Sequence, residues 1–364
     1  MKKILIISSE YRKSGPTNVI LNYARKLSDF FDISLVSLRL EATKNSSIHD
    51  KFSALGCNLK FFKKNILMKA IKELTKSHYV VINTHGIRAD ILVSIVGLFR
   101  PLNHYATIHN EPYKDYVNRY GNFKGRIMFF LHNQFVFKND NVIKLCVSIN
   151  VENVLQSYGA LNTKVAYNFI DSMAFKPAQS EVSKLNLLAS LSIPANKKVV
   201  VFCGHMTEIK DPLSLARAIR RLDEDKYFFV FLGDGPLKAD VQNELKEQSN
   251  YIMPGFVSFP EKYYKCADAF VMTSLTEGMP MALLEAMSAN LRIVASDIDI
   301  FNEICGLDEF DMELFGVGDD VLLSKAIEKS FSTQEICRNR DLSAKYFSGD
   351  DLFSQFNLKK CIDE

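Results

Sequence analysis

Short apolar runs alternate with amphipathic segments through the first half of the chain. Apolar runs predict buried strands, and apolar residues at three- and four-residue spacing predict helices. The expected strands are Ile4–Ser8, Ile33–Leu38, Leu59–Phe62, Val80–Asn83, Tyr105–His109 and Ile143–Ser148, and the expected helices are 18–27, 66–76, 87–99, 126–138 and 150–158. Such alternation is typical of a parallel sheet with helices on both faces.

The alternation stops between residues 169 and 197, where a polar, proline-containing stretch carries one expected helix at 181–190, and then begins again. The next strands are Lys198–Cys203, Tyr227–Leu232, Tyr251–Met253, Ala269–Thr273 and Arg292–Ser296, and the next helices are Pro212–Leu222, Leu237–Gln248, Glu261–Cys266, Met281–Ala289, Ile298–Cys305 and Asp319–Phe331. A chain of 364 residues also exceeds the usual size of a single core. We therefore expect an α/β protein with two Rossmann-like domains, residues 1–170 and 171–345, and a C-terminal helix within 346–364 that can cross back to the first domain.

Composition narrows the class of protein. With 47% hydrophobic and 24% charged residues, the chain resembles an ordinary soluble protein, and no apolar run reaches the ~18 residues that span a bilayer. The apolar run after Lys2 and Lys3 ends at Glu10, too early for a signal peptide, so we expect a cytoplasmic protein. The seven cysteines are an odd number without a CxxC pair, which favours reduced packing residues over disulfides or a zinc site.

Charge is distributed unevenly. Residues 1–175 hold 24 Lys and Arg against 12 Asp and Glu, whereas residues 176–364 hold 21 against 30. A basic first half favours an anionic partner such as a phosphorylated acceptor, a membrane surface or a nucleic acid. The absence of any recognisable nucleic-acid module disfavours the last of these.

The stretch from Thr276 to Glu285 carries the strongest candidate chemistry. Gly278 permits a sharp backbone turn, and Pro280 suits the first turn of a helix. The loop that leaves a parallel strand and enters a helix is where α/β proteins place ligands. Glu277 in this loop and Glu285 in the helix are then expected to face one cleft from different depths. By themselves, the same residues also fit an ordinary strand–loop–helix with two surface acids.

Three further loops could contact an anion. The turn Gly233–Pro236 precedes a helix and could bring backbone N–H groups to a ligand. Ser14–Asn18 opens a helix, either as an anion site or with Thr17 or Asn18 as a simple N-cap. Lys210, in the loop after strand 198–203, suits a phosphate, although a solvated lysine fits as well. None of these loops matches GxGxxG or GxxxxGK[ST], which disfavours NAD-dependent dehydrogenases and P-loop NTPases.

Several motifs follow one another in order along the second half. They are Gly204 with Lys210, Gly233–Pro236, Pro254–Val257, Tyr263–Val271, Ser274–Met287, Val294–Asp297 and Glu303–Ile304. In this order they resemble the retaining glycosyltransferases of family 4, which have the GT-B fold of two Rossmann-like domains with parallel sheets facing across a cleft. The first half resembles this family more loosely, through Asn83–Gly86, Ala106–Asn110 and Val165–Asn168.

The resemblance implies a nucleotide sugar as co-substrate, with UDP as the expected nucleotide, and neither a further cofactor nor a metal. Glu285 would hold the ribose hydroxyls, Lys210 the diphosphate, and Glu277 the hydroxyls of the donor sugar. The implied catalytic residues are Glu277, His109 and Lys210, and the implied donor-binding residues are Glu285, Gly278, Met279, Pro280, Lys210, His205, Gly15 and Gly235. A lysine and helix N-termini aimed at the departing diphosphate would lower the barrier. The sequence departs from the family at His205, where arginine is usual, at the single Gly15, and at Phe169 after Asn168.

Two segments interleave cations with large apolar residues, at 60–69 and 113–138. A basic surface with apolar tips can lie on an anionic leaflet. The residues expected to contact the acceptor or the membrane are Lys63, Lys64, Lys69, Arg119 and Arg126. A core helix that buries Phe129, Phe130 and Leu131 is the alternative.

The resemblance therefore implies a retaining hexosyltransferase. It would move a hexose or N-acetylhexosamine to a polyprenyl-diphosphate-linked or other glycan acceptor in bacterial surface polysaccharide (O-antigen, lipopolysaccharide or capsule) synthesis, at the inner face of the plasma membrane. The alternatives are a sugar-nucleotide epimerase or phosphorylase of the same fold, and a non-catalytic partner subunit that binds a nucleotide sugar.

Overall fold

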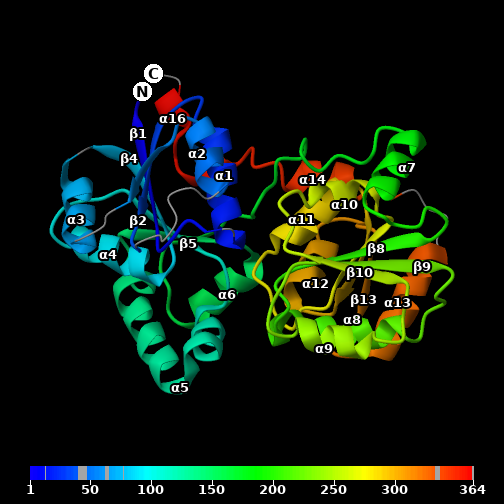
Figure 1. Cartoon of the computed structure of the whole chain (residues 1–364). Coiled ribbons are helices and arrows are strands. Elements are labelled where there is room, and N and C mark those ends of the chain that lie inside the picture. Colours follow the sequence, from blue (N-terminus) through cyan, green and yellow to red (C-terminus); the bar gives the residue numbers. More distant parts are fainter. Residues whose placement is uncertain (13, 40–46, 62–64, 77, 333–336, 363–364) are drawn as a thin grey trace. The chain divides into compact units, whose positions relative to one another are not determined.

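The computed structural model in Figure 1 describes residues 1–12, 14–39, 47–61, 65–76, 78–332 and 337–362. The chain divides into two compact units, Met1–Phe169 with Gly349–Glu364, and Ile170–Ser348. These borders lie close to the expected 170/171 and 345/346. Each unit is described by itself below, as unit 1 and unit 2.

Unit 1 is a seven-stranded parallel sheet with the strand order β3-β2-β1-β4-β5-β6-β7. Its strands are β1 (Lys3–Ser8), β2 (Asp32–Ser37), β3 (Asn58–Phe61), β4 (Tyr79–His85), β5 (His104–Ile108), β6 (Val142–Cys146) and β7 (Thr163–Val165). Its helices are α1 (Gly15–Leu27), α2 (Ser47–Ala54), α3 (Ile66–Lys76), α4 (Ile87–Gly97), α5 (Pro112–His132), a π-helical turn (Asn133–Phe137), α6 (Ile149–Ser157), α15 (Leu352–Gln355) and α16 (Lys359–Ile362). The register pairs Ile6 of β1 with Leu35 of β2 and with Asn83 of β4.

Unit 2 is a six-stranded parallel sheet with the order β10-β9-β8-β11-β12-β13. Its strands are β8 (Lys198–Cys203), β9 (Tyr227–Leu232), β10 (Tyr251–Gly255), β11 (Ala269–Met272), β12 (Arg292–Ser296) and β13 (Met312–Phe315). Its helices are α7 (Glu181–Ser190), a 3₁₀ turn (Glu208–Lys210), α8 (Pro212–Ile219), α9 (Lys238–Glu244), α10 (Glu261–Cys266), α11 (Met281–Ser288), α12 (Asp299–Cys305), α13 (Asp320–Ser332) and α14 (Asn339–Tyr346).

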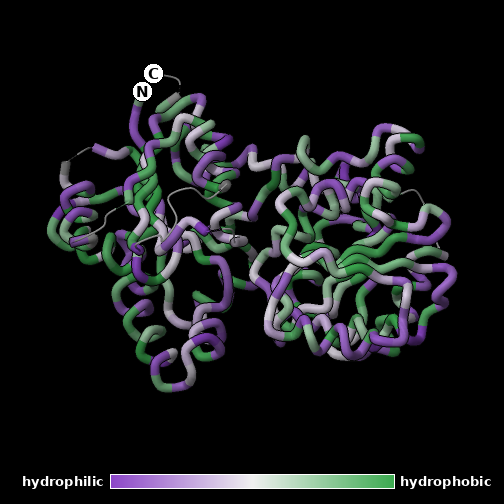
Figure 2. Tube along the Cα trace, viewed as in Figure 1, coloured by the Kyte–Doolittle hydropathy of each residue, from purple (hydrophilic) through white to green (hydrophobic). Residues whose placement is uncertain are grey.

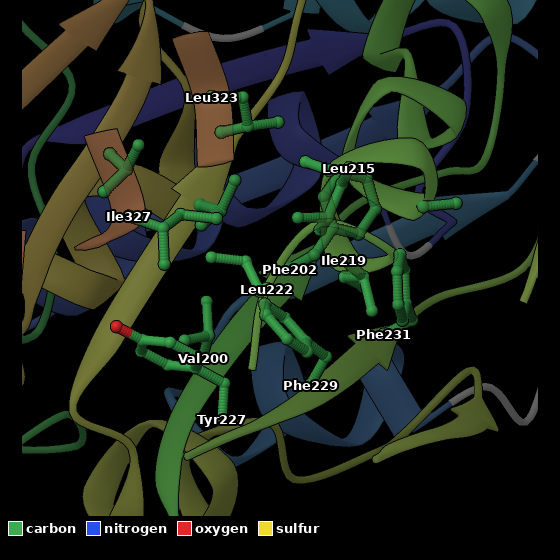
Figure 3. Packing of buried hydrophobic residues seen from close by; sticks show 14 of the residues in the cluster. Val200, Phe202, Leu215, Ile219, Leu222, Tyr227, Phe229, Phe231, Leu323 and Ile327 are labelled. Atoms are coloured by element: carbon green, nitrogen blue, oxygen red, sulfur yellow. The ribbon is translucent and has the colours of Figure 1, made fainter. Parts of the chain in front are cut away.

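The core of unit 2 shows why its strands are so apolar. Phe229 and Phe231 of β9 and Val200 of β8 pack against Ile219 of α8 and Ile327 of α13 (Figure 3). Strands that helices cover on both faces have no solvent-facing side, so they read as continuous hydrophobic stretches, as Figure 2 shows. The expected fold of two Rossmann-like domains follows from this pattern.

The structure adds elements that the hydrophobic pattern did not predict. β7 and β13 are short and only partly buried, and α2 lies outside the expected list. The expected helix at 126–138 is the second part of the longer α5 and the π-helical turn that follows it. The first part of α5 is rich in polar residues and glycine, so it has no clear apolar stripe.

The C-terminal tail packs on unit 1. The Tyr105 hydroxyl donates a hydrogen bond to the Phe356 carbonyl oxygen at 3.0 Å. The Phe356 ring lies edge-on against Tyr23 and Tyr105, with centroid distances of 5.6 and 5.1 Å. Leu352 and Leu358 are buried beside it. The tail therefore completes the core of the first unit, although it follows the second unit in sequence.

All seven cysteines are free, as expected from their number and spacing. Cys57, Cys146 and Cys266 are buried. They therefore serve as small apolar packing residues.

Two glycines after β9 are required by a close backbone approach. Gly233 has a φ of +129°, and a Cβ built on it would lie 2.0 Å from the Gly204 carbonyl oxygen. A Cβ on Gly235 would lie 2.5 Å from the Met206 carbonyl oxygen. The loops after β8 and β9 thus pack backbone to backbone, joined by the hydrogen bond from Met206 N to Asp234 O at 2.9 Å.

We expect Gly233→Ala to destabilise the protein by about 2–4 kcal/mol, because a backbone oxygen cannot move aside as a side chain can. Urea unfolding measures this change. Gly316→Ala is the matched control, since its Cβ would meet only side-chain atoms at 3.6 and 3.8 Å. Equal stabilities of the two variants would contradict the backbone clash.

Candidate functional site

The expected donor-binding residues of unit 2 lie on loops that leave neighbouring strands. Lys210 follows β8, Gly235 follows β9, and Glu277 follows β11. The carboxyl ends of parallel strands meet at one edge of a sheet, and this edge is where α/β proteins bind ligands. The strand order therefore brings residues together that are far apart in sequence.

Lys210 and Glu277 form an ion pair between the Lys210 Nζ and the Glu277 Oε1. The same carboxylate oxygen accepts a hydrogen bond from the Ser274 hydroxyl at 2.7 Å. The Glu277 side chain is only 9% exposed and that of Lys210 26%, so both ends of the pair are held. An ammonium has three N–H donors, and Glu277 uses one of them, so the lysine keeps capacity for a second anionic group.

The loop that carries Lys210 is tied to the exit of β11. The Thr273 hydroxyl donates to the Lys210 carbonyl oxygen at 2.7 Å, and Leu275 N donates to the Ile209 oxygen at 2.8 Å. Asp211 adopts a left-handed conformation, with a φ of +42°, and caps α8 by accepting from Ser214 N. Lys210 is therefore a positioned cation, and the alternative of a freely solvated lysine is wrong. Sequence reasoning missed Thr273 and Ser274, although Ser274 stands within the motif that the family shares.

Glu285 lies within α11 and is buried, whereas Glu277 lies in the loop before that helix. Glu277 thus precedes the helix and Glu285 lies inside it, as the sequence predicted. Glu285 lies near Tyr264, which is buried. Burial, and next the charges of Cys203 and Glu285, raise the pKa of Tyr264 well above its usual range. The thiol pKa of Cys203 is raised to about 12, mainly by burial and next by the charge of Glu285. Tyr264 and Cys203 are therefore close neighbours of the Glu285 carboxylate.

The backbone around these acids differs from two expectations. Gly278 does not adopt a positive φ, so an unusual glycine conformation does not shape this loop. Pro280 stands at the N-cap of α11 rather than in its first turn, and Met279 and Pro280 are buried. A Cβ on Gly235 would meet the backbone of Met206, so this glycine permits the close packing of the two loops.

His205 is exposed on the loop after β8, near Asp234. Hydrogen bonds from the Lys238 side chain and from Gly235 N lower the pKa of the Asp234 carboxyl. His205 thus stands at the same sheet edge as Lys210 and Gly235.

In unit 1, His109 follows β5 and meets His85, the last residue of β4. The His85 Nδ1 and the His109 Nε2 are 2.8 Å apart, and the His85 Nε2 lies 2.6 Å from the Asn83 Oδ1. The two rings stack with a centroid distance of 5.0 Å. His85 and Asn83 are buried, and burial lowers the pKa of His109 to about 4. His109 is therefore a neutral imidazole at physiological pH.

Gly15 is the first residue of α1 and is exposed. The N-cap of this helix is Ser14, whose hydroxyl oxygen accepts from Thr17 N at 3.4 Å, so the expected caps Thr17 and Asn18 are wrong. An N-cap side chain must precede the first helical residue, and the helix begins earlier than its apolar pattern.

The basic and apolar segment of unit 1 forms a bent helix. Gly121 interrupts α5 with a φ of +77°, and a Cβ on Gly125 would lie 2.7 Å from Tyr116, so the two arms of α5 fold against each other (Figure 1). Apolar side chains exposed at and beyond the bend are Tyr120, Phe123, Ile127, Phe130 and Leu131. Arg119 and Arg126 are exposed beside them, with Arg119 paired to Asp115 at 2.8 Å.

The alternative of a core helix holds for Phe129 alone. Its ring contacts Tyr113, Phe137 and Tyr158, whereas Phe130 is 60% exposed. Lys69 is exposed on α3. Lys63 and Lys64 lie outside the described residues.

Comparison with known proteins identifies the second unit. Residues 197–332 match the family model for glycosyl transferases group 1. This segment is a group 1 glycosyltransferase domain. It contains Lys210, Glu277 and Glu285, so the resemblance found in the sequence is confirmed.

Similarity to individual proteins extends beyond that domain. The O-antigen biosynthesis glycosyltransferase WclY of Escherichia coli is 25% identical over 307 residues, which are 83% of this chain and 82% of that protein. The Escherichia coli UDP-Gal:alpha-D-GlcNAc-diphosphoundecaprenol alpha-1,3-galactosyltransferase is 28% identical over 56% of this chain and 53% of its own length. The structure of Anabaena Alr3699/HepE in complex with UDP and glucose superposes with a TM-score of 0.81 over 100% of both chains, at 15% identity. That likeness confirms the GT-B type of fold.

In the ranges that the structure covers, no helix is both long and apolar enough to cross a bilayer. Within the same ranges, no three or more His, Cys, Asp or Glu side chains gather in a way that could hold a metal ion.

A second buried histidine of unit 1 gives a pH-dependent stability. His104 Nε2 lies 2.9 Å from the Thr84 hydroxyl, and the pKa of His104 falls from its ordinary 6.5 to about 4, mainly through burial. The unfolded chain thus binds this proton near pH 6.5 and the folded chain only near pH 4. The stability that the neutral ring contributes is complete above pH 6.5 and is lost as the pH falls toward 4.

We expect proton uptake by His104 in the unfolded chain to lower the free energy of unfolding by about 2 kcal/mol between pH 7 and pH 5. Urea unfolding of the wild type and His104→Gln at both pH values measures this decrease. The difference in unfolding free energy between the two proteins should narrow by that amount at pH 5, because only the wild type carries the titrating ring. A constant difference would show that His104 is not held neutral.

Proposed function

We propose that the protein is a retaining glycosyltransferase that moves a hexose or N-acetylhexosamine from a UDP-sugar to a polyprenyl-diphosphate-linked or other glycan acceptor. The observation that carries this proposal is the Lys210–Glu277 pair, with Glu285 buried in the following helix, inside the group 1 domain. The product would belong to a bacterial surface polysaccharide. The names of WclY and of the galactosyltransferase support that role.

The donor would bind to unit 2 with its two ends recognised separately. Glu285 would accept hydrogen bonds from the ribose hydroxyls, and Tyr264 and Cys203 are its close neighbours. Lys210 and the exposed His205 would contact the diphosphate. The UDP in the HepE structure and the UDP-Gal in the galactosyltransferase name support a uridine nucleotide.

Catalysis would proceed by stabilising the charge that develops when the anomeric bond breaks. The sugar becomes oxocarbenium-like, and negative charge grows on the departing diphosphate. Lys210 and the first-turn N–H groups of α11, next to Gly278–Pro280, would face this charge without a metal. Glu277, whose Oε1 is fixed by Lys210 and Ser274, would use its other oxygen to hold a donor-sugar hydroxyl. Retention would follow from front-face attack, with the leaving phosphate taking the acceptor proton.

The acceptor would bind to unit 1, near His109. The exposed apolar tips of α5, with Arg119 and Arg126 beside them, fit an anionic membrane surface on which a lipid-linked acceptor is found. This arrangement supports a peripheral position on the inner leaflet.

A donor screen tests the proposal directly. UDP- and GDP-sugars are compared for thermal stabilisation of the full chain, and the best donor is then assayed for nucleotide release with a lipid-linked acceptor, with and without EDTA. We expect a UDP-sugar to stabilise the protein, EDTA to have no effect, and the product to keep the anomeric configuration of the donor in its NMR spectrum. Stabilisation by no nucleotide sugar would overturn the proposal.

The site variants should separate binding from turnover. We expect Glu285→Ala to weaken UDP binding at least about 100-fold, and Lys210→Ala to lower kcat about 10²- to 10³-fold, because Lys210 acts on charge that develops in the transition state. Calorimetry with UDP and steady-state kinetics measure the two effects. Glu328→Ala and Lys325→Ala change exposed residues of α13 and should behave as the wild type. Wild-type values in both site variants would remove these roles.

Membrane binding has its own prediction. Phe123 and Phe130 are 79% and 60% exposed on α5, and Phe259 of unit 2 is 59% exposed. The double variant Phe123→Ser/Phe130→Ser should lose flotation with vesicles of anionic lipid at low salt, whereas Phe259→Ser should keep it. No flotation of the wild type would end the membrane proposal.

A further inference from the structure

A chain of hydrogen bonds runs through the interior of unit 1 to His109. Asn83 on β4 donates from Nδ2 to the Tyr105 carbonyl oxygen at 3.1 Å and to the Thr107 hydroxyl at 2.9 Å. Its Oδ1 faces the His85 Nε2 at 2.6 Å, and the His85 Nδ1 faces the His109 Nε2 at 2.8 Å. Three side chains are thus linked from the sheet to the loop after β5.

The hydrogen-bond partners of Asn83 determine which ring nitrogens of His85 and His109 carry a proton. A carbonyl oxygen can only accept, so the atom of Asn83 that faces Tyr105 must be the amide nitrogen. Oδ1 is then the atom facing His85, and it requires a proton on the His85 Nε2. A neutral His85 has no proton on Nδ1, so this nitrogen accepts a hydrogen bond from His109 Nε2–H.

The surroundings keep both rings neutral. Burial, with the charge of His109 as the next cause, lowers the pKa of His85 well below its ordinary value. Burial also lowers the pKa of His109, although Asp90 opposes this shift. The Tyr23 ring lies 6.0 Å from His85, and no carboxylate is among the hydrogen-bond partners found for these two histidines in the described part of the chain. With its single proton on Nε2, His109 has a lone pair on Nδ1.

We propose that Asn83 and His85 are positioning residues that hold His109 as the Nε2–H tautomer, so that its Nδ1 accepts a hydrogen bond from a hydroxyl group of the bound sugar. The identity of the ligand as a sugar rests on the proposed function. The tautomer rests on the hydrogen bonds alone.

This arrangement also decides which ligand group fits against His109. A lone pair attracts O–H and N–H donors and repels the oxygens of a phosphate or carboxylate, which only accept. A protonated imidazole would bind a diphosphate instead. Unit 1 would therefore recognise an uncharged hydroxyl at this position.

The test is the tautomer of His109 in the full chain labelled with ¹⁵N-histidine. Long-range ¹H–¹⁵N spectra at pH 7.5 distinguish protonated from unprotonated ring nitrogens, and the signals that disappear in His109→Gln assign the residue. We expect a protonated Nε2 and an unprotonated Nδ1 in the wild type. A proton on Nδ1, with or without one on Nε2, would overturn the proposal whatever the variants do.

His85→Phe then tests the positioning role of His85. The phenyl ring keeps the stacking but removes the acceptor, so His109 should become a mixture of tautomers, and kcat/KM for transfer should fall about tenfold, the effect of losing one hydrogen bond of roughly 1.4 kcal/mol. His104→Gln is the matched control, because it changes a buried histidine of the same sheet outside the chain of hydrogen bonds, and His109 should keep its tautomer.

An unchanged His109 tautomer in His85→Phe would overturn the positioning role. If that variant does not fold, Asn83→Asp replaces it. The new carboxylate should draw a second proton to His85, whose Nδ1–H would then donate to His109 and move the His109 proton to Nδ1; an unmoved proton would overturn the role. Failure of the wild type to use any nucleotide sugar would refute the proposed function and leave the tautomer result standing.

Discussion

The ion pair between Lys210 and Glu277 depends on the meeting of two loops at the carboxyl edge of the second sheet. Lys210 can reach Glu277 only because Thr273 and Leu275 hydrogen-bond to the backbone at residues 210 and 209. That contact in turn requires β8 and β11 to be neighbours in the sheet, which they are. The loop after β9 supports the same region through Gly233 and Gly235, which let its backbone touch the β8 loop. A half-buried ammonium needs a fixed counter-charge, and the parallel sheet supplies it from a residue 67 positions away.

The two units have the same architecture, but one carries charged side chains at the carboxyl edge of its sheet and the other carries neutral ones. Unit 2 places a charged pair and a second buried carboxylate at the edge of its sheet, as the binding of an anionic diphosphate and of ribose hydroxyls would require. Unit 1 places neutral groups at the corresponding edge, where Asn83, His85 and His109 are linked by hydrogen bonds. Burial keeps these histidines uncharged, because a charged imidazole would lose its hydration without gaining a counter-ion. Excess positive charge lies instead on exposed positions such as those of α5.

The sequence predicted the buried strands well, but not the bend of α5 or which glycines are required by close packing. The strands of both sheets are continuous apolar runs, so their positions and the α/β class followed from periodicity. The polar first arm of α5 has no such signal, and its bend at Gly121 depends on a tight contact between Gly125 and Tyr116. In the same way, Gly278 suggested a special turn, but at this edge of the sheet it is Gly233 and Gly235 that have positive φ and that another loop approaches closely. A glycine in a sequence shows that a turn is possible; which neighbour requires it is decided by packing.

The sequence by itself determined the two Rossmann-like halves, the loop–helix placement of Glu277 and Glu285, and the positions of Lys210 and His109 after strands. These are local properties, set by hydrophobic period and by the order of motifs along the chain. Only the tertiary structure decided that Lys210 pairs with Glu277 and that Tyr264 and Cys203 are neighbours of Glu285. It also decided that Asn83, through His85, fixes the proton on His109. Each of these contacts joins segments brought together by strand order and register, and hydrogen-bond direction depends on partners that no local pattern encodes.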